Sequence, residues 1–191
     1  MIREQIRPAL FSFVLLTLMT GVLYPLCMTG IANVFFRNQA EGSLIIKNGK
    51  ILGSELIGQP FDDPKYLWGR PSATSPAFNA SSSSGSNDGP MNADYLKAVG
   101  ERVKILKEAD PSNQALVPVD LVTASGSGLD PQISLAGAYY QVSRIARIRK
   151  ISEDPIKKII KKNTQKRFLG LLGESSVNVL KVNLDLDEVK K

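Results

Sequence analysis

The sequence lacks histidine entirely and has a single cysteine, Cys27, among its 191 residues. Without histidine, it cannot form a Ser-His-Asp or Cys-His catalytic arrangement or an HExxH zinc site, and it lacks the usual side chain for proton transfer near neutral pH. One cysteine cannot form an intrachain disulfide or a thiolate metal cluster. The composition still allows a hydrolase that uses only carboxylates. It also allows a site built from serine, backbone N–H groups and basic side chains.

Charge is also missing from one long segment, because residues 8–36 carry no formally charged side chain. A membrane-spanning helix needs only about 20 apolar residues. The run exceeds the roughly 7–15 residues typical of a signal peptide core, and Tyr24 and Pro25 at its outer end suit a membrane interface. A cleaved signal remains the alternative, since residues 30–32 loosely imitate a small-x-small cleavage site. We expect a cytoplasmic tail at 1–8 and a retained transmembrane helix at 9–31.

The positive charges near this segment predict its orientation. Arg3 and Arg7 crowd the short tail, whereas the basic residues after the helix are spread out and offset by Glu41 and Glu55. This asymmetry favours a cytoplasmic N-terminus, and a long following domain translocates largely regardless of its charge. We therefore expect residues 37–191 to form a single extracytoplasmic domain.

Small residues in the helix suggest a surface for another helix. Thr17, Thr20 and Gly21 share one face at i, i+3, i+4 spacing, which would allow close approach and a hydroxyl hydrogen bond. These three residues are candidate partner contacts. The alternative is that small residues are simply common in membrane helices.

The soluble part has the pattern of an α+β domain. Two apolar runs around Asn48-Gly49 predict a β-hairpin with a type I′ turn, and a long proline, glycine and serine-rich loop follows. Apolar periodicity then predicts three helices and a C-terminal strand. The expected elements are a hairpin at 44–52, a loop at 58–90, a helix at 92–109, an extended segment at 117–122, a helix capped by Ser134 over 135–150, a helix from 152, and a strand at 177–184.

Two loops are candidates for binding. The sequence Gly126-Ser127-Gly128 has backbone N–H groups that can cradle an anion, but a tight structural connection is the simpler interpretation because the dinucleotide and P-loop patterns are incomplete. Arg70, next to Trp68 in a rigid turn, suits anchoring of a partner or stacking on a ring. With Ser72 and Thr74 it forms a candidate partner contact, and the alternative is that Arg70 caps loop carbonyls.

The positive charge is concentrated in one region. Residues 144–167 carry ten basic and two acidic side chains, against +6 for the whole chain. No aromatic residues interleave this run, so nucleic acid is a poor candidate partner. Anionic lipid headgroups or an acidic protein surface fit better, and a solvated helix face is the simplest interpretation. No metal site and no catalytic residue follows from these patterns.

The ordered motifs resemble the C-chain family (KdpC) of the Kdp potassium-transporting ATPase over essentially the whole chain. They are Arg7-Pro8; Thr20-Gly21-Val22-Leu23-Tyr24-Pro25-Leu26; Gly42-Ser43-Leu44; Gly53-Ser54; residues 56–59; Gly69-Arg70-Pro71-Ser72-Ala73-Thr74; Ser84-Gly85-Ser86-Asn87; Val117-Pro118; residues 120–131; Gln141-Val142; Arg144-Ile145-Ala146; Arg149; Asn178-Val179-Leu180; Asn183-Leu184; and Leu186-Asp187.

The resemblance implies a non-catalytic subunit of a complex in the bacterial inner membrane. Its partners would be a potassium-binding chain (KdpA-like), an ATP-hydrolysing chain (KdpB-like) and a small accessory peptide chain. It further implies that the chain binds no cofactor firmly, although ATP could be bound through the complex. It also implies a role in raising the affinity of the ATPase chain for ATP. The glutamine that the family associates with that nucleotide role matches Gln141. An exported domain cannot reach a cytoplasmic nucleotide across about 30 Å of hydrocarbon, so any such effect would pass through partner helices.

Two other functions compete with this interpretation. One is a free-standing, membrane-anchored extracytoplasmic module that binds a small ligand with its loop at 68–74 and its serine tract at 81–84. The other is an anchored carboxylate-dependent enzyme, whose activity would depend on Asp120 or Asp130.

Overall fold

The computed structural model describes residues 2–189, with side chains from residue 4 onward. Met1, at the start of the predicted tail, and Lys190 and Lys191, at the end of the predicted domain, lie outside the described residues, as does the side chain of Arg3. The chain divides into two compact units, residues 1–44 and residues 45–191. We describe each by itself.

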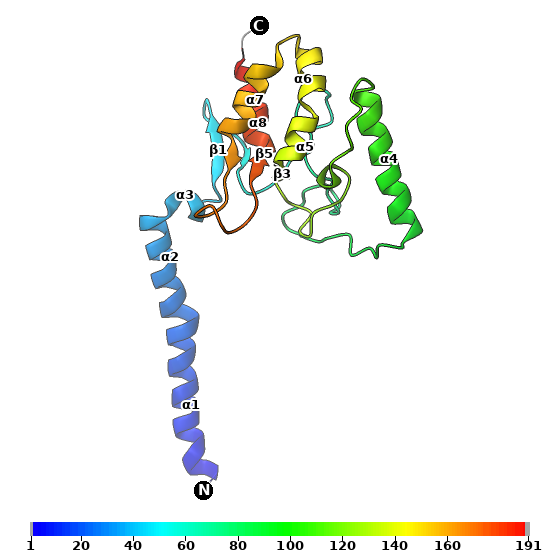
Figure 1. Cartoon of the computed structure of the whole chain (residues 1–191). Helices are drawn as coiled ribbons and strands as arrows, with labels where there is room; N and C mark the ends of the chain where they lie inside the picture. The colour runs from blue at the N-terminus through cyan, green and yellow to red at the C-terminus, as the bar shows by residue number, and fades with distance from the viewer. Residues whose placement is uncertain (1, 190–191) are drawn as a thin grey trace. The chain divides into compact units, whose positions relative to one another are not determined.

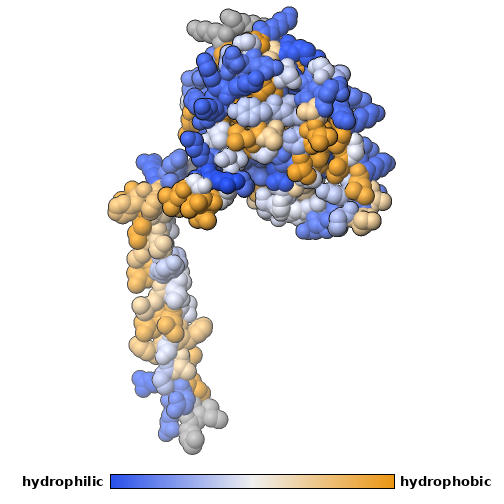
Figure 2. Space-filling view, in the orientation of Figure 1, coloured by the Kyte–Doolittle hydropathy of each residue, from blue (hydrophilic) through white to orange (hydrophobic). Residues whose placement is uncertain are grey.

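The first unit is a long helix that exposes its apolar side chains. It consists of α1 (Ile2–Leu18), a π-helical turn η1 (Met19–Leu23), α2 (Tyr24–Phe35) and the short α3 (Arg37–Ala40). The stretch Glu4–Phe35 is long and apolar enough to cross a membrane, and none of its most apolar window is buried. Figure 2 shows this helix as a largely hydrophobic column. An apolar surface of this extent needs lipid or other helices around it.

The second unit contains the other helices and strands (Figure 1). In chain order they are β1 (Leu44–Lys47), β2 (Lys50–Ser54), α4 (Ala93–Ala109), the 3₁₀ turn η2 (Val119–Leu121), β3 (Gln132–Ser134), α5 (Leu135–Tyr140), α6 (Val142–Arg149), α7 (Glu153–Lys162), β4 (Thr164–Gln165), β5 (Ser176–Asn178) and α8 (Val179–Glu188). The content is mixed α+β, as the sequence predicts.

Local signals placed several elements correctly. Asn48 and Gly49 both have positive φ, at 52° and 72°, as a type I′ hairpin turn between β1 and β2 requires. Asn92 caps α4, because its side chain accepts hydrogen bonds from the Asp94 and Tyr95 amides. Ser134 caps α5 by accepting from the Gly137 amide. In each case a short polar side chain or a glycine supplies what the backbone needs at that position.

A small antiparallel sheet in the order β3-β5-β4 organises the second unit. Gln132 pairs with Asn178, and Thr164 pairs with Val177. Helices α5 to α8 surround the sheet and share one core with it. The fully buried members of that core include Leu67, Ile145, Ile156, Ile160, Val177, Val182 and Leu186.

The predicted C-terminal strand at 177–184 is wrong. Only Ser176–Asn178 are extended, and the helix α8 begins at Val179. The Asn178 side chain accepts a hydrogen bond from the Lys181 amide and so caps the helix. Val179, Val182 and Leu186 are buried at helical spacing, and this pattern prevails over the alternation that also suits a strand.

Two further elements differ from their predictions. The helix predicted over 135–150 is broken at Gln141 into α5 and α6. The segment predicted as extended at 117–122 contains the 3₁₀ turn η2, which follows Pro118 in the β region. The side chain of Gln141, at this break, is buried.

Candidate functional site

Gln141 lies at the break between α5 and α6 and is 1% exposed. Its side-chain Oε1 accepts a hydrogen bond of 2.8 Å from the Trp68 amide. Its Nε2 donates to the Trp68 carbonyl at 3.0 Å and to the Gly137 carbonyl at 3.1 Å. The amide therefore pairs with both main-chain groups of Trp68, as a neighbouring strand would, and ties the loop to the helix break.

Arg144 completes this cluster from one turn further along α6. Its Nη2 donates to Gln141 Oε1 at 2.6 Å and to the Tyr66 carbonyl at 3.1 Å, and its Nη1 donates to the Pro64 carbonyl. The guanidinium carbon lies 4.0 Å from the centroid of the Trp68 ring, a cation–π contact. The Arg144 guanidinium is therefore held by two carbonyl groups and an aromatic ring of residues 64–68, and by the side-chain oxygen of Gln141.

The setting of Arg144 corrects part of the sequence analysis. The simplest interpretation of the basic region was a solvated helix face, but Arg144 is 2% exposed. Burial lowers the pKa of Arg144 to about 10, against the opposing influence of Asp110. The guanidinium is therefore still charged at neutral pH, and its hydrogen bonds and the Trp68 ring compensate the cost of removing it from water.

The arrangement bears on the nucleotide role attributed to Gln141. Both protons of its amide are donated within the chain, and its oxygen accepts two hydrogen bonds. A nucleotide could contact this side chain only after these bonds and the surrounding core had opened. The geometry gives Gln141 the role of positioning Trp68 and Arg144, and direct nucleotide contact stays a prediction.

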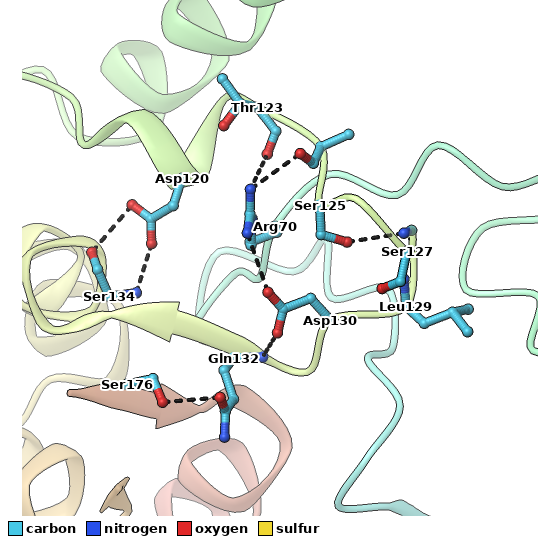
Figure 3. Close-up of polar contacts among 12 residues, drawn as sticks. Arg70, Asp120, Thr123, Ser125, Ser127, Leu129, Asp130, Gln132, Ser134 and Ser176 are labelled. Atoms are coloured by element: carbon cyan, nitrogen blue, oxygen red, sulfur yellow. Dashed lines mark hydrogen bonds and ion pairs between the residues drawn. The ribbon is translucent and has the colours of Figure 1, made fainter. Parts of the chain in front are cut away.

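Arg70 is bound within the chain in a second polar network (Figure 3). Its Nη1 lies 3.2 Å from Asp130 Oδ2, and its Nη2 donates to the Ala124 carbonyl at 3.1 Å and to the Thr123 carbonyl at 3.5 Å. This is the carbonyl-capping arrangement that the sequence analysis gave as the alternative. Contact of Arg70 with a partner stays a prediction.

Ser72 and Thr74 shape the loop that follows. Ser72 Oγ donates to the Gly128 carbonyl at 2.7 Å and accepts from the Phe78 amide at 2.9 Å. Thr74 Oγ1 donates to the Pro76 carbonyl at 2.8 Å and accepts from the Asn79 amide at 2.9 Å. Both hydroxyls thus serve as supports of the loop, and their predicted contact with a partner is untested.

The glycine-serine-glycine loop is packed as a structural connection. The Gly128 amide donates to Ser125 Oγ at 3.0 Å, and the Leu129 amide donates to Ser127 Oγ at 3.1 Å. Gly128 has a φ of +69°, and a Cβ atom there would lie 2.6 Å from the Ser84 carbonyl oxygen. Both amides donate to serine hydroxyls of the same loop and are therefore not free to hold an anion.

The two carboxylates considered for an enzyme brace β3. Asp120 accepts from the Ser134 amide at 2.6 Å and from Ser134 Oγ at 3.2 Å (Figure 3). Asp130 accepts from the Gln132 amide at 2.9 Å and pairs with Arg70. Each carboxylate has a structural task at one end of the strand. Among the described residues, no three acidic, cysteine or histidine side chains cluster to hold a metal.

A pocket of about 290 Å³ adjoins the loop at 68–72. Its wall combines this loop with Phe61, Phe78 and Arg102, together with apolar side chains of α4 and η2. The serine tract at 81–84 does not line it. Sequence patterns gave no signal for this pocket, because its lining comes from segments that only the tertiary fold brings together.

The candidate helix contacts lie in an unusual part of the first unit. Thr17 is in α1, whereas Thr20 and Gly21 lie in the π-helical turn, where the 3.6-residue period assumed by the sequence analysis does not apply. Thr20 Oγ1 donates to the Leu16 carbonyl at 2.7 Å, so its hydroxyl has a partner within the helix. A Cβ atom at Gly21 would have no neighbour within 4 Å. Contact with a partner helix stays a prediction.

Comparison with known proteins gives a consistent result over the whole chain. The family model described as KdpC, the c chain of the K⁺-transporting ATPase, matches residues 6–188. The chain is 57% identical to the potassium-transporting ATPase KdpC subunit of Methylococcus capsulatus, over 98% of this chain and 99% of the relative. The corresponding subunit of Dechloromonas aromatica is 56% identical over 99% and 100%, and that of Janthinobacterium sp. is 55% identical over 97% and 99%.

Proposed function

The chain belongs to the KdpC family of K⁺-transporting ATPase subunits, and from this premise we propose that it is an accessory, non-catalytic subunit of an ATP-driven potassium uptake complex. It would assemble with a potassium-binding chain and an ATP-hydrolysing chain and stabilise them. The long apolar helix would anchor it in the plasma membrane, with the N-terminus in the cytoplasm and the second unit outside.

One observation carries the proposal: the candidate glutamine, the candidate loop arginine and the candidate carboxylates of the second unit are engaged in holding it together. Gln141 pairs with Trp68, Arg70 pairs with Asp130, and Asp120 caps β3. A general acid or base must lie within hydrogen-bond reach of the proton that it transfers. Because these side chains bind other parts of the chain, they favour a domain that acts through its shape and surface rather than through catalysis.

An influence on ATP affinity fits this arrangement as an indirect effect. If the second unit lies outside the membrane, its contribution reaches the nucleotide site only as a coupling free energy transmitted by partner helices. The break at Gln141 would then matter because it holds the Trp68 loop in the shape that the partners recognise.

Affinity purification of the tagged full-length chain from gently solubilised membranes tests the proposal. The potassium-binding and ATP-hydrolysing chains should be recovered with it in stoichiometric amounts. Recovery of this chain alone, from cells that produce all the subunits, would contradict membership of a complex.

Ligand binding in the pocket beside residues 68–72 is a second candidate function. The pocket of about 290 Å³ supports it, although this volume is at the lower end for small-molecule sites. Soaking or screening the full-length chain with small metabolites would test it. A ligand that protects Arg102 from chemical modification would favour this function, and unchanged reactivity with every ligand would count against it.

A further inference from the structure

An apolar loop between β4 and β5 is the strongest feature that the function described above leaves unused. Phe168, Leu169, Leu171 and Leu172 are 68%, 80%, 80% and 65% exposed. We call residues 168–172 the apolar tip. Soluble surfaces rarely gather large apolar side chains in this way unless a partner or a membrane covers them.

The apolar tip is a formed turn. Phe168 and Leu172 exchange main-chain hydrogen bonds of 2.8 and 3.0 Å, and the Leu171 amide donates to the Phe168 carbonyl at 3.1 Å. Leu169 and Gly170 both have positive φ, at 53° and 74°, and make the reversal. Several main-chain polar groups are thus satisfied within the tip, which lowers the cost of placing it in a medium without water.

Basic side chains flank the tip. A hollow of about 600 Å³ is lined by Gly170 and by the basic residues Lys161, Lys166 and Arg167, together with Leu135 and Tyr139. Arg167 pairs with Glu174 at 2.6 Å, whereas Lys161 and Lys166 form no ion pair with any residue that the structure describes. An apolar projection beside unpaired cations matches the chemistry of an anionic lipid surface, where acyl chains lie beneath phosphate groups.

A short segment connects the apolar helix to the second unit. Residues 36–43 join α2 to β1, and at about 3.3–3.6 Å per residue they cannot extend beyond roughly 30 Å. Figure 1 shows that the loop between β4 and β5 lies at the end of the second unit where β1 begins. The covalent connection therefore limits how far the start of β1 can lie from the end of α2.

We propose that the apolar tip inserts into the interfacial layer of the bilayer, with Lys161 and Lys166 against the phosphates of anionic phospholipids. The insertion would hold the second unit at a defined height and orientation on the membrane. This inference rests on the membrane anchoring in the proposed function, but it does not depend on assembly with the other chains.

Site-directed spin labelling of the full-length chain tests the insertion. The variant Cys27→Ser removes the native thiol, and Leu171→Cys places a nitroxide on the tip after reconstitution into phosphatidylcholine vesicles that contain phosphatidylglycerol. Oxygen concentrates in the bilayer and a nickel chelate stays in water. We expect the ratio of oxygen to nickel relaxation at residue 171 to exceed, several-fold, the ratio at Leu116→Cys, a matched site that is 93% exposed.

Equal ratios at the two sites would overturn the proposal. Shielding of residue 171 from both reagents only when the other subunits are present would also overturn it, because a protein would then cover the tip. The double variant Lys161→Gln/Lys166→Gln, or vesicles without phosphatidylglycerol, should lower the ratio at residue 171, and an unchanged ratio would refute the role of anionic lipid. Copurification of the other chains is measured separately, so a failed insertion would leave the proposed complex standing.

Discussion

Single residues in the second unit act mainly by joining distant segments. Gln141 and Arg144 bind the main chain of residues 64–68, and Arg70 binds the loop at 123–130. In the sequence, Arg70 was a candidate for partner contact because Trp68 lies next to it in a rigid turn. Gln141 was a candidate for a nucleotide role because it matches a family motif. It could not reveal their partners, because each contact joins segments that are distant in the chain and has no local periodic signal.

Replacing Gln141 by leucine tests its positioning role. The variant Gln141→Leu leaves the Trp68 amide and carbonyl and part of the Arg144 guanidinium without partners in a buried site. We expect a loss of about 3 kcal/mol in the free energy of unfolding. Chemical unfolding of the purified full-length chain, without nucleotide or other subunits, measures this.

Gln114→Leu is the matched control, since Gln114 is an exposed glutamine in the loop after α4. It should change the unfolding free energy by no more than about 0.5 kcal/mol. If Gln141→Leu were equally harmless, the side chain would not be structural, and a role limited to nucleotide contact would regain support.

At the scale of elements, the sequence predicted what local signals specify and missed what depends on pairing. The hairpin turn at Asn48-Gly49 and the cap at Ser134 were correct because each needs only nearby residues. The sheet β3-β5-β4 was missed because its strands are only two or three residues long, and because β3 pairs with β5 across a long stretch of chain. Residues 177–184 satisfy both a strand and a helix pattern, and only burial against the core selects the helix α8.

The two glycines of the 126–128 loop offer a matched comparison. A Cβ atom at Gly128 would lie 2.6 Å from the Ser84 carbonyl oxygen and 2.8 Å from Thr74 Cγ2, at a positive φ, whereas Gly126 has open space. We expect Gly128→Ala to cost about 1–3 kcal/mol of stability and Gly126→Ala to be close to neutral. Thermal unfolding of the two variants measures the difference. Equal effects would contradict the structural role of the tight turn.

The contact between α7 and α8 predicts a dependence of stability on pH. Burial of Asp185 raises its pKa, but hydrogen bonds from Asn163 and Lys162 outweigh this and hold the pKa below its usual value. Because the folded carboxylate resists protonation, the unfolded chain takes up the proton first as the pH falls below about 4. The stabilisation is therefore present at neutral pH and is lost as the pH falls through the lower, folded pKa.

Asp185→Asn should remove this contribution. The variant should be less stable than the wild type at pH 6, and the difference should shrink as the pH approaches 3. Unfolding of both proteins across this range provides the measurement. Parallel stability curves would show that the carboxylate does not link the two helices in the way described.

The whole molecule consists of a long apolar helix and a domain in which Gln141, Arg70, Asp120 and Asp130 bind other parts of the same chain. Membership of the KdpC family indicates that the chain is a subunit of a K⁺-transporting ATPase complex. The fold suggests how the subunit contributes to that complex. The absence of histidine and the lone cysteine, Cys27, are consistent with a subunit whose partners carry out the chemistry. We propose that the second unit acts from the side of the membrane opposite to ATP.

Cysteine labelling in intact cells tests this claim most directly. In a Cys27→Ser background, Leu116→Cys places one thiol on the surface of the second unit, at a site that is 93% exposed. A membrane-impermeant maleimide should label this thiol in intact cells whose outer barrier has been made permeable. Labelling only after the plasma membrane is broken would place the domain in the cytoplasm and contradict the account.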